Sequence, residues 1–120
     1  MRFPEKTFPL ALLVICALAF GVFLPWLGFY WDDWPVILMS KFFGVNAFAE
    51  FYKYDRPISA WTYILTAPLL GLTPLAWQIF ALVLRWLTGL FYWLTLRLLW
   101  PHRKRETAWV AVLFLIYPVF

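Results

Sequence analysis

Two long apolar runs, residues 9–30 and 74–100, limit what this chain can fold into. A helix rises about 1.5 Å per residue, so a run of roughly 20 residues crosses the ~30 Å apolar core of a bilayer. The composition agrees, because 65% of the residues are hydrophobic and 13% are charged, whereas soluble domains average about 25% charged residues. We therefore predict an all-α polytopic membrane protein whose first two spans cover 9–30 and 74–100.

The first run has a second interpretation, a cleaved signal peptide. The tripeptide Ala17-Leu18-Ala19 resembles a cleavage site. The apolar run continues well past it, from Phe20 to Leu24. We therefore expect an uncleaved membrane anchor, which Pro25 kinks or ends near the outer interface.

Residues 31–73 separate the two spans, and their first part, residues 31–56, is the only long stretch of mixed charge. A short helix is expected over 36–43, directly after Pro35, and a second from Asn46 to Tyr54. Both are rich in aromatic and apolar residues but too short to span. They suit helices that lie in the plane of the membrane interface.

Residues 57–72 are apolar, but Pro68 and Gly71 interrupt them, and the segment is short for a span. Basic residues in short loops stay on the cytoplasmic side, and a basic loop, 102–106, follows the second span. If 57–72 also crossed the membrane, that loop would lie outside. We therefore predict that 57–72 lies in the interface, that the N-terminus is cytoplasmic, and that 31–73 is an external loop.

The third apolar run, 107–120, is too short to cross the membrane, because roughly 14 residues make ~21 Å of helix. We therefore expect residues 1–120 to be the N-terminal part of a longer multi-spanning protein, cut within its third span.

Asp32 and Asp33 are the first candidates for chemistry, because they directly follow the first span among Tyr30, Trp31 and Trp34. Tyr and Trp favour the membrane interface, where two carboxylates are costly to desolvate. Such a pair provides a general base or hard oxygen ligands for Mg²⁺ or Mn²⁺. The alternative is that acidic residues simply mark the external exit of the helix. We predict both as catalytic residues, with Asp32 as the candidate ligand for a divalent cation.

Three further residues are candidates for substrate binding. Arg56 lies in the same external loop and offers a planar fork suited to phosphate; the alternative is that it snorkels or pairs with Asp55. Arg85 lies about 17 Å along the second span, where an arginine costs at least ~2.5 kcal/mol unless it faces protein or a wet cavity. Gln78 shares its helical stripe, and structural and functional interpretations of Arg85 stay open.

Several other functions are excluded or disfavoured. The net charge of +4 does not indicate nucleic-acid binding, because much of it lies in Arg103-Lys104-Arg105 and no basic face is interleaved with polar side chains. The single cysteine, Cys16, excludes an internal disulfide. His102 is expected on the opposite side of the membrane from the Asp pair. The sequence contains no Gly-rich phosphate loop, HExxH or GxSxG motif.

Four short motifs, in their order and spacing, resemble the N-terminal region of the multi-spanning, C-superfamily glycosyltransferases. They are Tyr30-Trp31-Asp32-Asp33, Tyr54-Asp55-Arg56-Pro57, Gly71-Leu72-Thr73-Pro74 and Leu87-Thr88-Gly89-Leu90-Phe91. The pattern is most similar to the O-mannosyltransferase-like members, including those with tetratricopeptide repeats and the bacterial Arg-Pro type. The resemblance covers essentially all of this sequence but only a modest part of a typical member.

The resemblance implies transfer of a sugar from a polyprenyl-phosphate donor to an acceptor, with inversion, on the external side of a bacterial plasma membrane. It implies that Asp32 is the base or metal-site ligand, that Asp33 is its acidic neighbour, and that Arg56 is the loop arginine that organises the site. The expected partners are the lipid bilayer, the polyprenyl-phosphate-linked sugar and an acceptor of unknown identity.

The sequence also departs from that family. Members often carry His and Asn at the start of the second span and a further His one to two turns on, where this chain has Gln78, Ala81 and Arg85. The rest of the bundle that would close a donor groove is not in these 120 residues, so we expect them to be inactive alone.

The competing interpretation is a polytopic transporter, or a membrane assembly subunit without catalytic activity, in which the acids and Arg85 line a path. Transporters place ionisable groups near the membrane midplane, often at broken helices. Here the acids cluster at one interface, which favours a surface-facing site for a lipid-linked substrate.

Overall fold

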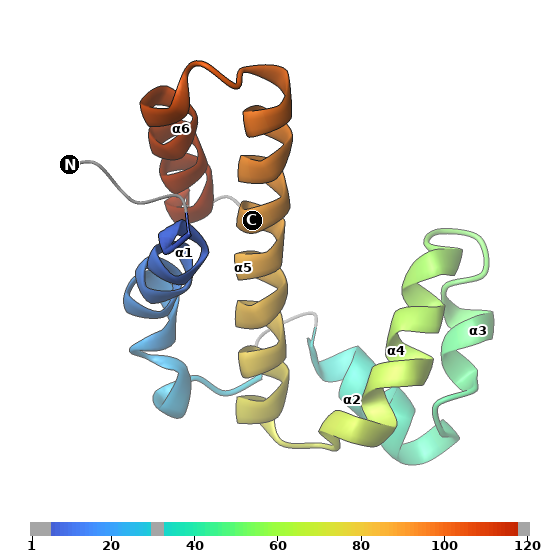
Figure 1. Ribbon diagram of the computed structural model, residues 1–120. Helices are drawn as coiled ribbons and strands as arrows, with labels where there is room; N and C mark the ends of the chain where they lie inside the picture. Colours follow the sequence, from blue (N-terminus) through green and yellow to red (C-terminus); the bar gives the residue numbers. More distant parts are fainter. Residues whose placement is uncertain (1–5, 30–32, 118–120) are drawn as a thin grey trace. The chain divides into compact units, whose positions relative to one another are not determined.

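The computed structural model describes residues 6–29 and 33–117, and all regular structure in these residues is helical (Figure 1). The described residues form two compact units. The long-helix unit comprises Met1–Pro25 and Gln78–Phe120, and the short-helix unit comprises Trp26–Trp77.

The long-helix unit begins with α1 (Phe8–Cys16), which continues as a π-helix, η1 (Ala17–Gly21). A short 3-10 turn, η2 (Leu24–Trp26), ends this run at the boundary with the short-helix unit. Helix α5 (Pro74–Leu99) enters the long-helix unit at Gln78, and α6 (Lys104–Ile116) follows it after a short turn. Figure 1 shows α1 and α6 beside α5.

The short-helix unit contains α2 (Asp33–Phe43), α3 (Ala47–Phe51) and α4 (Pro57–Leu70). Two glycines allow its sharp turns, because Gly44 after α2 has φ 78° and Gly71 after α4 has φ 63°. Residues with a Cβ rarely adopt such angles.

Proline positions explain where three helices begin. Pro9, Pro57 and Pro74 stand at the first or second position of α1, α4 and α5. An amide N–H in the first turn has no partner within the helix, so a residue without one is tolerated there.

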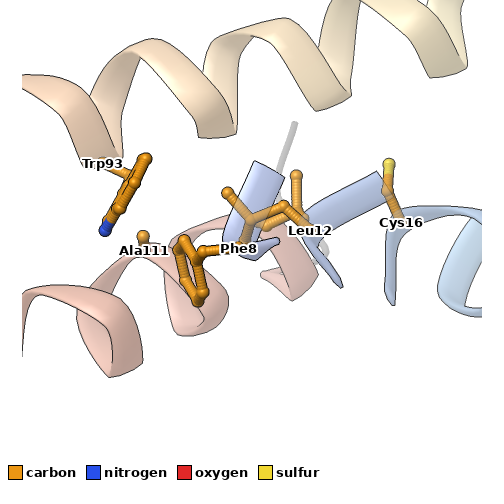
Figure 2. Packing of buried hydrophobic residues seen from close by; sticks show 6 residues of the cluster. Phe8, Leu12, Cys16, Trp93 and Ala111 are labelled. Atoms are coloured by element: carbon orange, nitrogen blue, oxygen red, sulfur yellow. The ribbon is translucent and has the colours of Figure 1, made fainter. Parts of the chain in front are cut away.

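Helices α1 and α6 bury the same kind of stripe, one residue in four. On α1 the stripe is Phe8, Leu12 and Cys16; on α6 it is Thr107, Ala111 and Leu115. These spacings put each set on one helical face. The two stripes meet in one hydrophobic core, and Figure 2 shows the part of it where Phe8 and Leu12 of α1 lie near Trp93 of α5 and Ala111 of α6.

Specific contacts bind α5 to the two other helices of the long-helix unit. The Phe8 and Trp93 rings have centroids 4.8 Å apart, and Trp86 Nε1 donates to the carbonyl of Pro9 at 3.0 Å. On the side of α6, the Tyr92 and Phe114 rings stack with centroids 4.3 Å apart. These contacts turn the face of α5 that carries Trp86, Tyr92 and Trp93 toward α1 and α6.

Within the described residues, two helical runs are long and apolar enough to cross a membrane, Phe8–Trp26 and Pro74–Leu99. Only 17% of the apolar window in each is buried inside the protein. Helix α4, with 14 residues, is shorter than either. The all-α prediction is therefore confirmed for the described residues. The first helical run ends at Trp26 rather than at residue 30, and the second ends at Leu99, one residue before the expected end.

The structure differs from the sequence-based expectations at several helix ends. Helix α2 begins at Asp33 rather than at residue 36, since Pro35 is accommodated in its first turn. Helix α3 ends at Phe51 rather than at Tyr54. Helix α6 begins at Lys104, inside the segment expected to be a basic loop, rather than at residue 107.

Candidate functional site

Asp33 lies in the first turn of α2, and its residue is exposed. A carboxylate is favourable there, because the N-terminal end of a helix carries partial positive charge. The next residue, Trp34, is 51% exposed and meets Phe29 edge to face, with ring centroids 5.8 Å apart. Asp32, the other member of the predicted pair, lies outside the described residues.

Arg56 occupies the residue before α4, in the same unit as Asp33. Its carbonyl accepts a hydrogen bond from the Ser59 amide at 2.9 Å, which ties the backbone of the turn to the helix. Its Nε lies 3.3 Å from Oδ2 of Asp55. The pairing that the sequence offered as the alternative for Arg56 is therefore present.

Both members of the Arg56–Asp55 pair are exposed, with side chains 70% and 74% accessible. A second exposed pair, between Lys53 Nζ and Glu50 Oε2 at 3.5 Å, lies just before it. Exposed ion pairs contribute about 0–1 kcal/mol, so neither pair adds much to the stability of the fold. The turn that connects α3 to α4 thus presents cations without burying them.

An aromatic stack holds this turn in place. The ring of Tyr63 on α4 lies 5.2 Å from that of Phe48 on α3 and 5.5 Å from that of Tyr52, the residue that follows α3. The ring of Trp77 lies 5.9 Å from Tyr63 on its other side, and its Nε1 donates to the carbonyl of Gly71 at 2.9 Å. The stack was not predicted from the sequence, although Phe48 and Tyr52 are four residues apart within the helix expected from Asn46 to Tyr54, a spacing that puts two side chains on one helical face.

Arg85 lies in the interior of α5 and contacts both of the other helical runs of the long-helix unit. Its Nε donates to the carbonyl of Leu115 at 3.1 Å, and its Nη2 donates to the carbonyl of Tyr117. Its guanidinium carbon lies 3.8 Å from the centre of the Phe20 ring, in the π-helix η1. Arginine over an aromatic face is favourable, the more so away from water.

Gln78 lies two turns before Arg85 on α5 and is half-buried. Both belong to the long-helix unit, whereas Asp33 and Arg56 belong to the short-helix unit. Each unit therefore contains two of the predicted site residues. Their roles in catalysis and in substrate binding stay predictions.

In residues 6–29 and 33–117, no three His, Cys, Asp or Glu side chains come together as a group that could hold a metal ion. The described residues thus do not fit a divalent cation by themselves, and we derive no step through one. Asp32 as a ligand stays a prediction.

Comparisons with protein-family models, with curated proteins and with solved structures found no match for this chain.

Proposed function

We propose that this chain supplies the first two spans and the first external loop of a membrane glycosyltransferase. The enzyme moves a sugar from a polyprenyl-phosphate donor to an acceptor on the extracytoplasmic side of a bacterial plasma membrane. The observation that carries the proposal is the exposed Arg56–Asp55 turn. It lies in the same packed helical unit as Asp33, in a chain with two helical runs of span length.

Membrane location is supported by the exposed apolar surface of both long helical runs. Leu18 is 68% exposed and Phe23 66% in the first, and Phe91 is 62% and Leu98 84% in the second. Burying a side chain of this size away from water is worth about 1.5–3 kcal/mol. Lipid covers such a surface all round, whereas a soluble partner would have to enclose both helices.

Topology follows from charge and length. With two spans, the basic segment that begins at Arg103 lies on the cytoplasmic side with the N-terminus, in keeping with the distribution of Lys and Arg in membrane proteins. Helix α4 is too short to add a third crossing, since 14 residues make ~21 Å of helix against a ~30 Å core. Its exposed residues Ile58, Trp61, Leu65 and Leu69 are 66–84% accessible and recur every three or four positions. They suit a helix that lies in the outer interface.

The roles of the site residues follow from the chemistry of the donor. Transfer of the sugar leaves negative charge on a polyprenyl phosphate, and Arg56 provides a fork that pairs with phosphate oxygens at headgroup depth. The acceptor hydroxyl needs a base on the opposite face of the anomeric carbon, and Asp32 or Asp33 supplies it. We assign no step to Gln78 or Arg85.

The test is transfer from a polyprenyl-phosphate-linked hexose in membranes that contain the complete protein. Asp32→Asn, Asp33→Asn and Arg56→Gln are the active-site variants. Loss of one catalytic base typically lowers turnover by about 10²–10⁴-fold, so at least one Asp variant should fall in that range. Arg56→Gln should reduce transfer and raise KM for the donor.

Matched controls come from the second ion pair of the same unit. Glu50→Gln and Lys53→Gln make the same changes in side-chain chemistry, two residues or more from the proposed site. They should keep transfer within about twofold of the unmodified protein, since exposed pairs contribute little. Near-normal transfer by both Asp variants would end the proposal.

A transporter or assembly subunit is the second candidate, and one observation favours it. Arg85 and the π-helix η1 meet inside the apolar helices, and π-bulges are frequent at functional sites. If substitution of Arg85 abolishes a transport or assembly phenotype while the Asp32, Asp33 and Arg56 variants leave it intact, this second candidate replaces the transferase.

A further inference from the structure

Helix α6 ends beside Arg85, and the local sequence explains why it ends there. The helix runs to Ile116, after which Tyr117 is extended, with φ −64° and ψ 127°. Pro118 follows in the sequence, and a proline disfavours the helical conformation in the residue before it. The last carbonyl groups of a helix need partners from outside the regular helical pattern.

The lengths of the two helices place this end within the second span. From Arg85 to the end of α5 the chain rises about 21 Å, and the 13 residues of α6 rise about 20 Å. Leu115 and Tyr117 accept hydrogen bonds from Arg85, so α6 returns along α5 and stops at the level of that residue. Arg85 itself is about 17 Å from the start of α5.

Two groups that are costly in lipid satisfy each other at this point. The apolar core of a bilayer offers no water to bind open carbonyl groups, and an arginine there needs a protein partner. The two guanidinium donors meet two carbonyls at a helix C-terminus, where partial negative charge favours a cation. The ring of Phe20 contacts the guanidinium group as well, at 3.8 Å.

We propose that Arg85 is an intramembrane clamp, which holds the C-terminal end of α6 inside the membrane between η1 and the middle of α5. In this view Arg85 is a structural cation instead of a ligand for substrate. The inference rests on the membrane location proposed above, but it is independent of the sugar-transfer reaction. Its failure and that of the transferase proposal are therefore distinguishable.

A disulfide between α5 and α6 measures whether the end of α6 is held. A Cβ built on Gly89 lies 3.6 Å from Cβ of Leu115, within the ~3.5–4.5 Å that disulfides require. The double variant Gly89→Cys/Leu115→Cys is made in a Cys16→Ala background of the complete protein, in membranes. After oxidation with copper phenanthroline and denaturation, thiols that still react with a polyethylene-glycol maleimide report the unlinked fraction.

The clamp predicts that the disulfide between positions 89 and 115 forms efficiently when residue 85 is arginine. In the Arg85→Met background it should form at least about fivefold less, because open carbonyls in lipid disfavour the helix end. Arg85→Lys keeps the charge but loses the fork, and should link to an intermediate extent. The control is Arg97→Met, the same substitution on the same helix, where Nη1 donates to the Pro101 carbonyl at 3.1 Å in an exposed turn. It should link as the parent does.

The native thiol separates a local effect from general unfolding. Cys16 is fully buried, and its Sγ lies 3.9 Å from the Leu82 carbonyl of α5. In the protein without added cysteines, Arg85→Met should leave Cys16 protected from a membrane-permeant maleimide. Unchanged cross-linking in Arg85→Met overturns the clamp. Loss of cross-linking together with exposure of Cys16 in both the Met and the Lys variants also overturns it, since Arg85 would then hold the whole unit and not the end of α6.

Discussion

Gly89 of α5 and Leu115 of α6 approach so closely that a Cβ at position 89 would lie 2.8 Å from Cδ1 of Leu115. Leu115 is 1% exposed, so its side chain has little room to move away. Small residues allow this kind of approach between helices in membranes, where packing, not the exclusion of water, drives association. The contact lies one turn from Arg85 and helps to set how α6 lies against α5.

Gly89→Leu should therefore force α6 away from α5. Overpacking typically costs about 1–3 kcal/mol, and we expect a lower unfolding temperature in detergent, read by the reaction of buried Cys16 with a fluorogenic maleimide. Ala81→Leu, which adds a leucine at an exposed position of the same helix, is the control. Equal unfolding temperatures for the two variants would contradict the close approach.

Leu12→Ala should destabilise the long-helix unit, because Leu12 is fully buried in the core between α1, α5 and α6. Removing a buried leucine side chain costs about 2–5 kcal/mol. Leu10→Ala, two residues away on the same helix and 61% exposed, should cost much less. The same thiol-reactivity measurement compares them, and a larger loss for Leu10→Ala would show that α1 faces the other way.

Phe48→Ala should loosen the short-helix unit. Phe48 is fully buried, and its ring stacks on Tyr63 across α3 and α4. Loss of a buried phenylalanine costs about 3–5 kcal/mol, and faster proteolysis between α2 and α4 in spheroplasts or right-side-out vesicles, where the protease reaches the external face, measures it. Phe43→Ala, at a residue 78% exposed, is the control. If the two variants are cleaved at the same rate, the aromatic stack does not support this unit.

Positions 54 and 103 should lie in different compartments. Tyr54 is 92% exposed in the turn before α4, and Arg103 precedes α6. In a Cys16→Ala background, Tyr54→Cys should react with an impermeant maleimide added to intact cells, whereas Arg103→Cys should react only after permeabilisation. Labelling of both from one side would remove the topology on which the external site depends.

Most of the helical plan could be predicted from the sequence. Long apolar runs and prolines in first turns act locally, so they predicted α5 within one residue of its ends and the presence of short helices between the long runs. Helix ends were less predictable where local signals conflict. Pro35 by itself predicts a helix that starts directly after it, but a proline is equally acceptable as the third residue of α2.

The sequence by itself determined that this chain is helical, that two of its helical runs reach membrane-spanning length, and which residue types carry its charge. Only the tertiary structure decided what the charged residues contact. Arg56 and Arg85 are the same residue type, yet one forms an exposed pair with its neighbour and the other binds carbonyls 30 and 32 residues away. The physical reason is that helix periodicity is a local property of the chain, whereas the partner of a side chain depends on which distant backbone the packing of Gly89, Trp93 and Leu115 brings beside it.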